Sequence, residues 1–331
     1  MQKKTSQDGP PVAFAGAAAG RVAWTDASVD MSTPIVRSTP AFLFRWNDQE
    51  DRAVLKDLLV PLADSTADGA AIRFAIELGE SQGARVRIIE TVYLPPPAIG
   101  TPDPTPRPSF LAAQDALRRE AADRAARIRA RTAEHPGISV EVHEAGTETP
   151  AELAAQLAFS ADMAILGGWS GFATPDPIGL ALFNALLFEA GRPVVVVPPH
   201  WRPSGNACAI VGWKGTANAC RALHAAIPLL QQVQSVQLVE VCRYRDELDE
   251  ADTVMPSLVE HLRGWGIAAS ATRLSGRHRR SSEVLVDHAN AVKASLIVVG
   301  GYGHSRLREW AIGGMTRELL LGAAIPVLYA H

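Results

Sequence analysis

The sequence predicts an α/β protein made of two tandem doubly wound domains, each with a five-stranded, mainly parallel sheet flanked by helices. Three observations predict this fold. Apolar, β-branched runs alternate with helical stretches of ten or more residues, which is typical of a parallel sheet covered by helices on both faces. The same order of elements occurs twice along the chain. A matched interval also repeats, since Gly167 precedes Pro193 by 26 positions and Gly300 precedes Pro326 by 26.

The first repeat is predicted to occupy residues 54–200. Its strands are rich in aliphatic residues, and its helices are rich in alanine, a strong helix former. The predicted strands are Val54–Pro61, Ala84–Tyr93, Ile138–His143, Met163–Leu166 and Pro193–Val197, and the predicted helices are Thr66–Gln82, Phe110–Glu134 and Pro150–Phe159. Residues 94–109 contain too much proline for a helix or a central strand, so we expect a loop insertion over the carboxyl edge of the sheet.

The second repeat is predicted to occupy residues 206–331 and follows the same order. Its predicted strands are Ala207–Trp213, Val236–Cys242, Ile267–Thr272, Leu296–Val299 and Pro326–Tyr329, and its predicted helices are Thr216–Leu230, Ala251–Gly264 and Ser281–Val292. This repeat lacks the proline-rich insertion. Residues 1–53 fit no part of either repeat, and their mixture of Gly, Ala, Ser and Pro with little periodicity predicts a disordered extension.

Composition excludes several classes of function. The formal net charge of −3 gives no electrostatic case for a nucleic-acid partner. No apolar run reaches the roughly 18 residues of a membrane span. The three cysteines show no Cys-x-x-Cys spacing, which indicates free thiols in a reducing compartment. We therefore expect a cytoplasmic protein with neither a nucleic-acid nor a membrane partner.

The most informative motif is the glycine-rich stretch Gly300–Ser305, which directly follows an apolar strand and precedes a second pair, Gly313 and Gly314. Glycines at the carboxyl end of a strand let the backbone approach a ligand closely, because no Cβ intervenes. A helix that begins at the second pair offers unpaired N–H groups and the positive end of its dipole. Together these features predict a cradle for phosphate and therefore a nucleotide site.

Several better-known phosphate and nucleophile motifs do not fit this stretch. A dinucleotide fingerprint would require glycine where Arg306 stands, and a nucleophile elbow around Ser305 would require glycine where Leu307 stands. No Gly-x-x-x-x-Gly-Lys-Ser/Thr sequence occurs anywhere in the chain. The motif that remains is Gly300-x2-Gly303-x9-Gly313, continued by Gly314, Met315 and Thr316.

This spacing resembles the nucleotide loop of the universal stress protein family, written there as Gly-x2-Gly-x9-Gly-Ser/Thr. The run Gly-Gly-Tyr-Gly-His-Ser-Arg and the final Ile325-Pro326-Val327-Leu328 are also similar to that family. The resemblance covers residues 206–331 well and 54–200 weakly. It implies a fold shared with the adenine-nucleotide α-hydrolases (the HUP fold). It also implies a regulatory protein of the stress response that binds ATP or AMP, with or without Mg²⁺, in its C-terminal domain, with little or no turnover.

The nucleotide is expected outside the carboxyl ends of the first and fourth strands of the second repeat, where ligands of open α/β sheets bind. By the resemblance, four glycines line the ribose and phosphates, and the backbone near Val241 contacts the adenine. The predicted nucleotide-binding residues are Gly212, Trp213, Lys214, Gly215, Thr216, Val241, Val299, Gly300, Gly303, His304, Ser305, Arg306, Gly313, Gly314, Met315 and Thr316. No catalytic residue and no metal ligand is predicted.

Two residues depart from the family pattern. Lys214 stands where an aspartate is usual, which removes a ligand for ribose or metal but adds a cation suited to phosphate. Gly314 replaces the usual Ser/Thr and keeps only its N–H, while Thr316 lies two residues further on. These departures keep open a second interpretation, an interaction or scaffold module that no longer binds nucleotide. A third, an enzyme of the related α-hydrolase group, lacks the metal-binding carboxylate and a catalytic pair.

The first repeat is predicted to have lost the site. The matched 26-position interval places Ser170, Leu180 and Ala181 at the positions of Gly303, Gly313 and Gly314, and Ala63 stands at the aspartate position. Strands 193–198 and 326–330 are predicted edge strands. In the family such strands pair across an interface, which implies either an internal pseudo-dimer of the two halves or an edge for a second copy or another protein.

Overall fold

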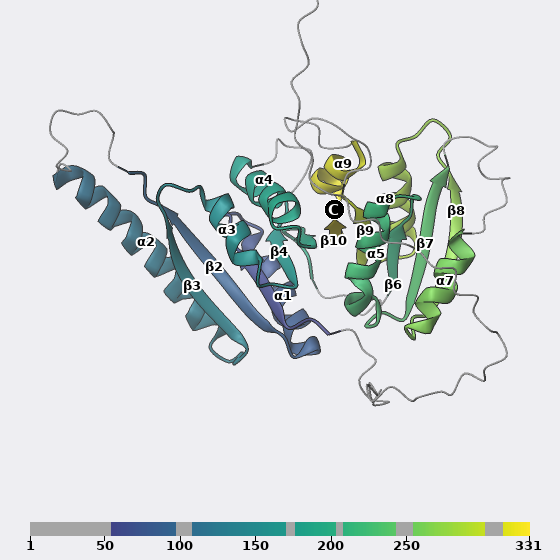
Figure 1. Cartoon of the computed structure of the whole chain (residues 1–331), viewed down its shortest axis with the longest axis horizontal. Helices are drawn as coiled ribbons and strands as arrows, with labels where there is room; N and C mark the ends of the chain where they lie inside the picture. Colours follow the sequence, from purple (N-terminus) through teal and green to yellow (C-terminus); the bar gives the residue numbers. More distant parts are fainter. Residues whose placement is uncertain (1–53, 97–107, 170–175, 203–207, 243–253, 302–313) are drawn as a thin grey trace, which may run out of the picture. The chain divides into compact units, whose positions relative to one another are not determined.

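The computed structural model describes residues 54–96, 108–169, 176–202, 208–242, 254–301 and 314–331 (Figure 1). The first repeat contains β1 (Asp57–Pro61), α1 (Asp68–Gln82), β2 (Arg85–Tyr93), α2 (Pro108–Thr132), β3 (Ile138–Ala145), α3 (Pro150–Ala158), β4 (Met163–Gly167), α4 (Pro177–Asn184), the π-helix η1 (Ala185–Glu189) and β5 (Val194–Val197). The predicted extension 1–53 and most of the proline-rich insertion lie outside the described residues.

The second repeat has the same order of strands. It contains β6 (Cys208–Gly212), α5 (Ala217–Leu230), β7 (Ser235–Cys242), α7 (Val254–Gly264), β8 (Ala269–Ser275), α8 (Ser281–Ala291), β9 (Leu296–Gly300), α9 (Gly314–Gly322) and β10 (Val327–Ala330). Each strand predicted from the sequence is present, with boundaries that differ by a few residues. The apolar runs form strands because their side chains are buried on both faces of the sheet, as all five residues of β4 are.

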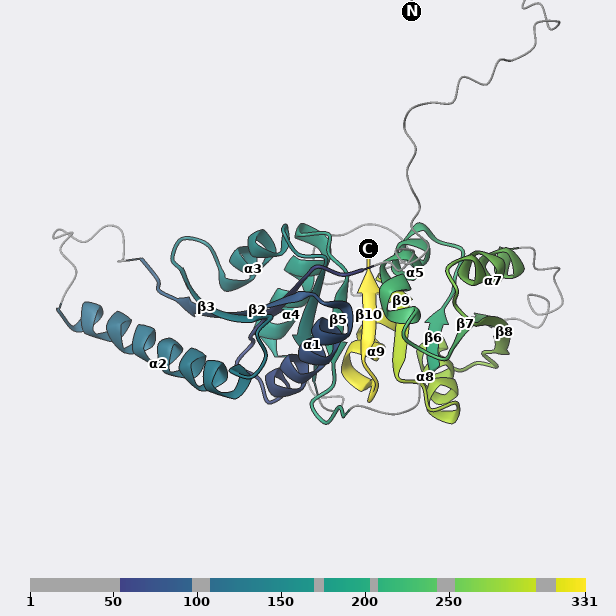
Figure 2. The same cartoon turned by 90° about the horizontal axis from the view of Figure 1, so that it is seen from below.

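The strands form one ten-stranded sheet in the order β3-β2-β1-β4-β5-β10-β9-β6-β7-β8. Within each half every neighbouring pair is parallel. Helices cover both faces of the sheet (Figure 2). One apolar layer is built on α1, α2, α5 and α7, and the other on α3, α4, η1, α8 and α9. The fold class predicted from the sequence is confirmed.

The two halves join through β5 and β10, which pair antiparallel with Val327 opposite Val196 and Tyr329 opposite Val194. This confirms the predicted internal pseudo-dimer. It corrects the alternative in which strands 193–198 and 326–330 offer free edges to a second copy or another protein. β5 lies between β4 and β10, and β10 lies between β5 and β9, so both edges of each strand are occupied. The Phe183 and Tyr329 rings pack edge-to-face beside this seam, with centroids 5.2 Å apart.

One element was not predicted. Residues 177–189 form α4 and η1, for which the sequence shows little amphipathic pattern because the segment is apolar on most sides. A local signal was nevertheless present. Asp176 precedes Pro177, and aspartate at the N-cap with proline at the first helical position is a typical helix start. In the described part of the chain, no helix combines the length and apolarity required to cross a bilayer.

Candidate functional site

The loop between β6 and α5 forms one wall of the predicted site. Its first residue is tied to the sheet, because the Trp213 amide donates to the Val239 carbonyl at 2.8 Å. At the far end, Thr216 caps α5, and its hydroxyl accepts from the Ala219 amide at 3.3 Å. Lys214 and Gly215 between them are exposed, and their amides have no partner among the described residues. The loop therefore presents two N–H groups and one ammonium group to solvent.

The end of β9 lies beside this loop, since Gly212 of β6 is in register with Val299. On its other side β6 pairs with β7, which leads to Val241. The helix predicted to start at the second glycine pair is confirmed, because α9 begins at Gly314. The structure thus assembles the strand ends named in the prediction. Gly303, His304, Ser305, Arg306 and Gly313 lie outside the described residues, so their predicted roles stay predictions.

Two of the predicted glycines face open space. A Cβ added to Gly215 would meet no atom within 4 Å. A Cβ on Gly314 would meet only the Glu318 carboxylate, at 4.0 Å. That carboxylate is itself held by Arg280 at 2.9 Å and by the Ser282 hydroxyl. Neither glycine is therefore required by packing within the described chain, which leaves room for an external group at both.

Two other predicted glycines have an internal explanation. A Cβ on Gly300 would lie 2.6 Å from the Ala219 nitrogen and 2.7 Å from the Asn218 carbonyl carbon. A Cβ on Gly212 would lie 3.0 Å from the Leu285 side chain. Gly300 is therefore glycine because the first turn of α5 packs directly on β9, whether or not a ligand binds nearby.

The remaining predicted residues are partly or fully buried. Val241 and Met315 pack against the apolar layer that contains α8 and α9, and Trp213 packs against the opposite layer, which contains α5. Thr316 has only 4% of its surface exposed, so its hydroxyl faces the interior of the domain. The backbone of these residues, rather than their side chains, is what the site could offer.

The equivalent β1–α1 loop of the first half is closed by a side chain of its own. Asp68 accepts from the amides of Ala63 at 3.4 Å and Ser65 at 3.1 Å, and from the Ser65 hydroxyl at 2.8 Å. Burial raises the pKa of Asp68, and these hydrogen bonds oppose that rise. A carboxylate of the protein thus occupies the donors that an external anion would use. Asp68 was not predicted from the sequence to have this role, and its counterpart in the second half is Ala219.

The second anion position of the first half is closed in the same way. At the start of α4 the Asp176 carboxylate accepts from the amides of Ile178 at 3.4 Å and Gly179 at 3.1 Å. Leu180 and Ala181, predicted to replace two loop glycines, lie within this helix. Ser170 lies outside the described residues. The Asp176 carboxylate therefore occupies the start of α4, and the Asp68 carboxylate occupies amides of the β1–α1 loop, so both positions are filled by aspartates of the chain itself.

The first half also carries charged clusters that the sequence analysis did not assign. Arg124 of α2 contacts the buried Glu90 at 2.6 Å and Glu120 at 3.1 Å. Burial raises the pKa of Glu90, while its bonds from Arg124 act in the opposite direction. In the ranges that the structure describes, no three His, Cys, Asp or Glu side chains are grouped so that they could hold a metal ion.

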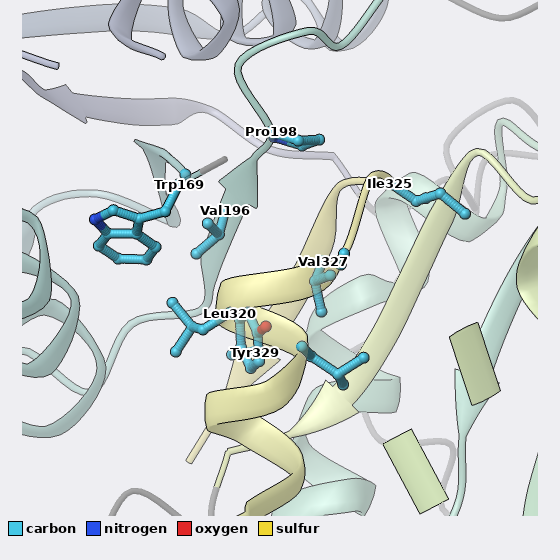
Figure 3. Close-up of a pocket in the computed structure, with 10 residues that line it drawn as sticks. Trp169, Val196, Pro198, Leu320, Ile325, Val327 and Tyr329 are labelled. Atoms are coloured by element: carbon cyan, nitrogen blue, oxygen red, sulfur yellow. The ribbon is translucent and has the colours of Figure 1, made fainter. Parts of the chain in front are cut away.

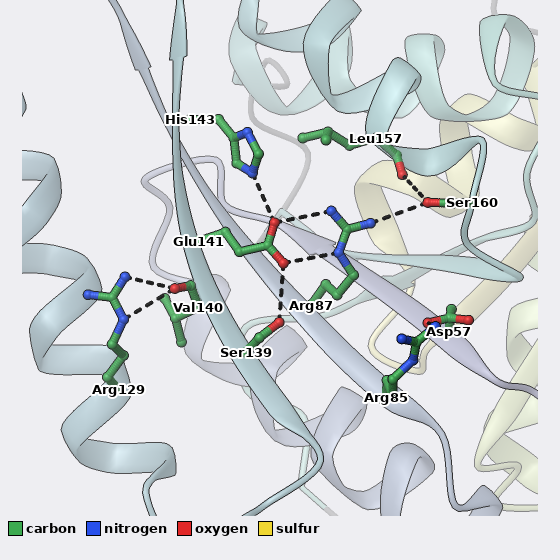
Figure 4. Close-up of polar contacts among 10 residues, drawn as sticks. All are labelled: Asp57, Arg85, Arg87, Arg129, Ser139, Val140, Glu141, His143, Leu157 and Ser160. Carbon is green, nitrogen blue, oxygen red and sulfur yellow. Dashed lines mark hydrogen bonds and ion pairs between the residues drawn. The ribbon is translucent and has the colours of Figure 1, made fainter.

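A second cluster lies on β2 and β3 (Figure 4). Arg87 donates to both oxygens of Glu141, each at 3.1 Å, and Glu141 also accepts from Ser139 at 3.2 Å. His143 lies 3.0 Å from the same carboxylate. Hydrogen bonding from Arg87, chiefly, lowers the pKa of Glu141 to about 2. The cluster contains no nucleophile at a useful distance, and it acts as an ion-pair network across the two strands.

A small pocket opens at one end of the seam between the halves (Figure 3). It is lined by Gly168, Trp169, Val196, Pro198, Leu319, Leu320, Ala323, Ile325, Val327 and Tyr329. Its cavity volume of about 10 Å³ has room for about one water molecule and is far below the roughly 300–1,000 Å³ of typical ligand pockets. The Tyr329 hydroxyl is buried without a partner among the described residues, and desolvation raises its pKa well above the ordinary value. This pocket is separate from the predicted nucleotide site.

Comparison with known proteins gives one family. The model of the universal stress protein family matches residues 55–169 and 210–331. No curated protein matches the sequence. Among solved structures, a universal stress protein from Archaeoglobus fulgidus DSM 4304 shares 14% identity over 83% of this chain and 97% of that chain, with a TM-score of 0.64. A functionally unknown protein from Pseudomonas aeruginosa PAO1 shares 14% identity over 83% of this chain and 92% of that chain, with a TM-score of 0.50.

Proposed function

The chain belongs to the universal stress protein family, and from this premise we propose that its second half binds ATP or AMP. The bound nucleotide would serve a regulatory role in a stress response, with little or no turnover. The observation that carries this proposal is the difference between the two β–α loops. Asp68 occupies the amides of the first loop, whereas the amides of Lys214 and Gly215 in the second loop are exposed and without a partner in the described chain.

The charges of the second loop support an anionic ligand. Lys214 carries an exposed ammonium group and lies between Gly212 and Gly215 in the sequence, neither of which has a side chain that could hinder a ligand. The neighbouring Thr216 caps α5, whose first turn has no acidic residue. Ammonium groups and helix starts both favour phosphate. The α9 start adds a second set of backbone donors at Gly314. A phosphate chain on this half of the sheet would therefore be bound mainly by main-chain amides and one lysine.

Little turnover is expected because the loop supplies binding groups only. Its polar side chains are those of Lys214 and Thr216, and neither is a carboxylate that could hold a metal ion or activate water. The family aspartate that would supply such a group is replaced by Lys214. We therefore expect slow or no release of phosphate from bound ATP.

The test is a calorimetric titration of the full chain with AMP and with ATP, the latter with and without Mg²⁺. Lys214→Ala should weaken binding about three- to tenfold, the range expected for one charge-assisted hydrogen bond on an exposed loop. Lys56→Ala removes an equally exposed lysine from the first half and should leave affinity unchanged. If the wild-type chain binds neither nucleotide, the proposal fails, and Lys214 and Gly314 then favour the scaffold interpretation.

A further inference from the structure

The residue at which β9 passes into the glycine loop is held by three hydrogen-bonding groups. Gly301 donates its amide to the Ala330 carbonyl at 2.7 Å. Its carbonyl accepts from the Asn218 side-chain amide at 2.6 Å. The same amide lies 3.1 Å from Nδ1 of the C-terminal residue His331. Nδ1 also lies 3.2 Å from the Gly301 carbonyl. With Nδ1 unprotonated, the two amide hydrogens of Asn218 can bridge that carbonyl and Nδ1, and with Nδ1 protonated the imidazole can itself donate to the carbonyl.

The first half of the chain completes this contact. A Cβ on Gly301 would lie 2.9 Å from the Leu187 side chain, so η1 packs directly against this glycine. The adjacent Phe188 ring meets the His331 imidazole edge-to-face, with centroids 4.8 Å apart. Gly301 is therefore held by Asn218 of α5, by His331 and by η1 of the first half.

The opposite end of the seam shows that the fold itself does not require these polar contacts. Gly168 is the counterpart of Gly301, 133 positions earlier, and its amide likewise donates to the Val197 carbonyl at 2.7 Å. There, however, Ala67 stands at the position of Asn218 and Pro198 at the position of His331. The two side-chain contacts occur only at the end that leads into the glycine loop.

We propose that Asn218, His331 and Phe188 are positioning residues for the nucleotide site, and that the first half serves that site by holding Gly301 in place. This inference rests on the proposed nucleotide binding of the second half. Gly301 directly follows β9, which is in register with β6 beside the exposed Lys214–Gly215 loop, so a shift at Gly301 would move the strand end that forms one side of the proposed site. The first half, whose own loop amides are filled by aspartates, thereby helps to position the nucleotide site of the second half.

The test compares nucleotide affinity with stability in the full chain. Phe188→Ala, Asn218→Ala and His331→Ala should each weaken AMP and ATP binding about three- to tenfold, as expected when one anchoring contact is lost. Their melting temperatures should stay within a few degrees of wild type, because Phe188 is already 38% exposed and His331 is exposed as well. Phe159→Ala removes a more exposed phenylalanine of the same half, at 58%, and should change neither quantity.

Two further variants distinguish positioning from general structural support. His331→Asn offers an oxygen close to the position of Nδ1 and should retain most of the affinity. The double variant of Phe188→Ala and His331→Ala should lose no more affinity than the larger single loss, because the two rings act as one contact. Wild-type affinity in all three alanine variants would overturn the inference and leave the proposed function intact. Failure of the wild-type chain to bind either nucleotide would overturn both.

Discussion

The two halves share their strands and their order of elements, yet their first β–α loops differ through one side chain. In the first half, Asp68 accepts from amides of the β1–α1 loop, and Asp176 accepts from the first amides of α4. In the second half, Ala219 replaces Asp68, and the neighbouring amides of Lys214 and Gly215 are exposed. The difference teaches that one fold can either leave the amides of this loop open or fill them with a carboxylate of the chain, through a change at a single position.

The comparison also separates two kinds of glycine. Gly167 and Gly300 end β4 and β9, and a Cβ on either would collide, within 3.0 Å, with the backbone at the start of the helix that follows the neighbouring strand, α1 or α5. Both halves retain them, although only one half has an open loop. Gly215 and Gly314 have open space instead, and the first half has replaced both. Gly83, Gly191 and Gly266 also face open space, but their positive φ accounts for glycine there. Among the glycines of the predicted site, Gly215 and Gly314 are therefore the two that packing does not explain.

The largest expected effect tests this division. Gly300→Ala places a Cβ 2.6 Å from a backbone nitrogen that cannot rotate away, so the free energy of unfolding should fall at the upper end of the roughly 1–3 kcal/mol seen for overpacked sites. Gly314→Ala should change it by less than about 0.5 kcal/mol. Urea denaturation of both variants measures the difference. Equal losses in the two would show that the described contacts do not distinguish these glycines.

A graft tests the closure by carboxylates. Ala219→Asp copies Asp68 into the second half, where its carboxylate can accept from the Lys214 amide as Asp68 does from the Ala63 amide. Nucleotide affinity should fall at least about tenfold, since the donors are occupied and the added charge repels phosphate.

The matched variant for this graft is Ala219→Asn, which has nearly the same size but no charge. It should weaken binding less than the aspartate does, and circular dichroism should show both variants folded. If calorimetry gives the aspartate variant the affinity of wild type, closure by Asp68 does not explain why the first half differs.

Much of the fold could be predicted because strands buried on both faces leave a strong signal. The runs around Leu58 and Ile297 are aliphatic throughout, and each forms a central strand as expected. The pairing of β5 with β10 could be predicted only through the family resemblance, which implies that these strands pair across an interface. α4 and η1 were missed, because the segment also carries apolar residues on its exposed side, such as Ile178 and Phe188, and therefore shows no regular apolar stripe.

The site could be predicted only in outline. The spacing of the loop glycines gives the strand ends that meet, and the structure places Gly212 beside Val299 as expected. The spacing of the glycines does not show which of them is required by packing. That depends on contacts with α5, whose residue Asn218 lies 83 positions before its partner Gly301 in the sequence. The roles of Asp68 and His331 depend likewise on contacts made only after folding.

A smaller effect is expected at the ion pair between β2 and β3, which has no bidentate equivalent among the described contacts of β7 and β8. Glu141→Gln removes the charge that Arg87 bonds through two nitrogens. The free energy of unfolding at pH 7 should fall by on the order of 1 kcal/mol, a value reduced by partial exposure of both side chains.

The contribution of this ion pair to the free energy of unfolding should depend on pH. The pKa of Glu141 is lowered to about 2 in the folded chain, so its contribution is present above the ordinary carboxylate range and is lost as pH falls through about 4.5 toward 2. Denaturation of wild type and variant should therefore differ at pH 7 and converge near pH 2. A constant difference across that range would mean that the ionised carboxylate is not what stabilises the strands.

The smallest expected effect compares the two ends of the seam. At the Gly301 end the Gly301 carbonyl accepts from the Asn218 side chain, whereas at the pocket end the Tyr329 hydroxyl is buried with no partner in the described chain (Figure 3). Tyr329→Phe removes a polar group that makes no compensating bond, so stability should stay unchanged or rise by up to about 1 kcal/mol. Tyr93→Phe, at a side chain 48% exposed, should have no effect. A loss of more than about 1 kcal/mol at Tyr329 alone, measured by urea denaturation, would mean that the hydroxyl is bonded and that both ends of the seam are anchored by polar contacts.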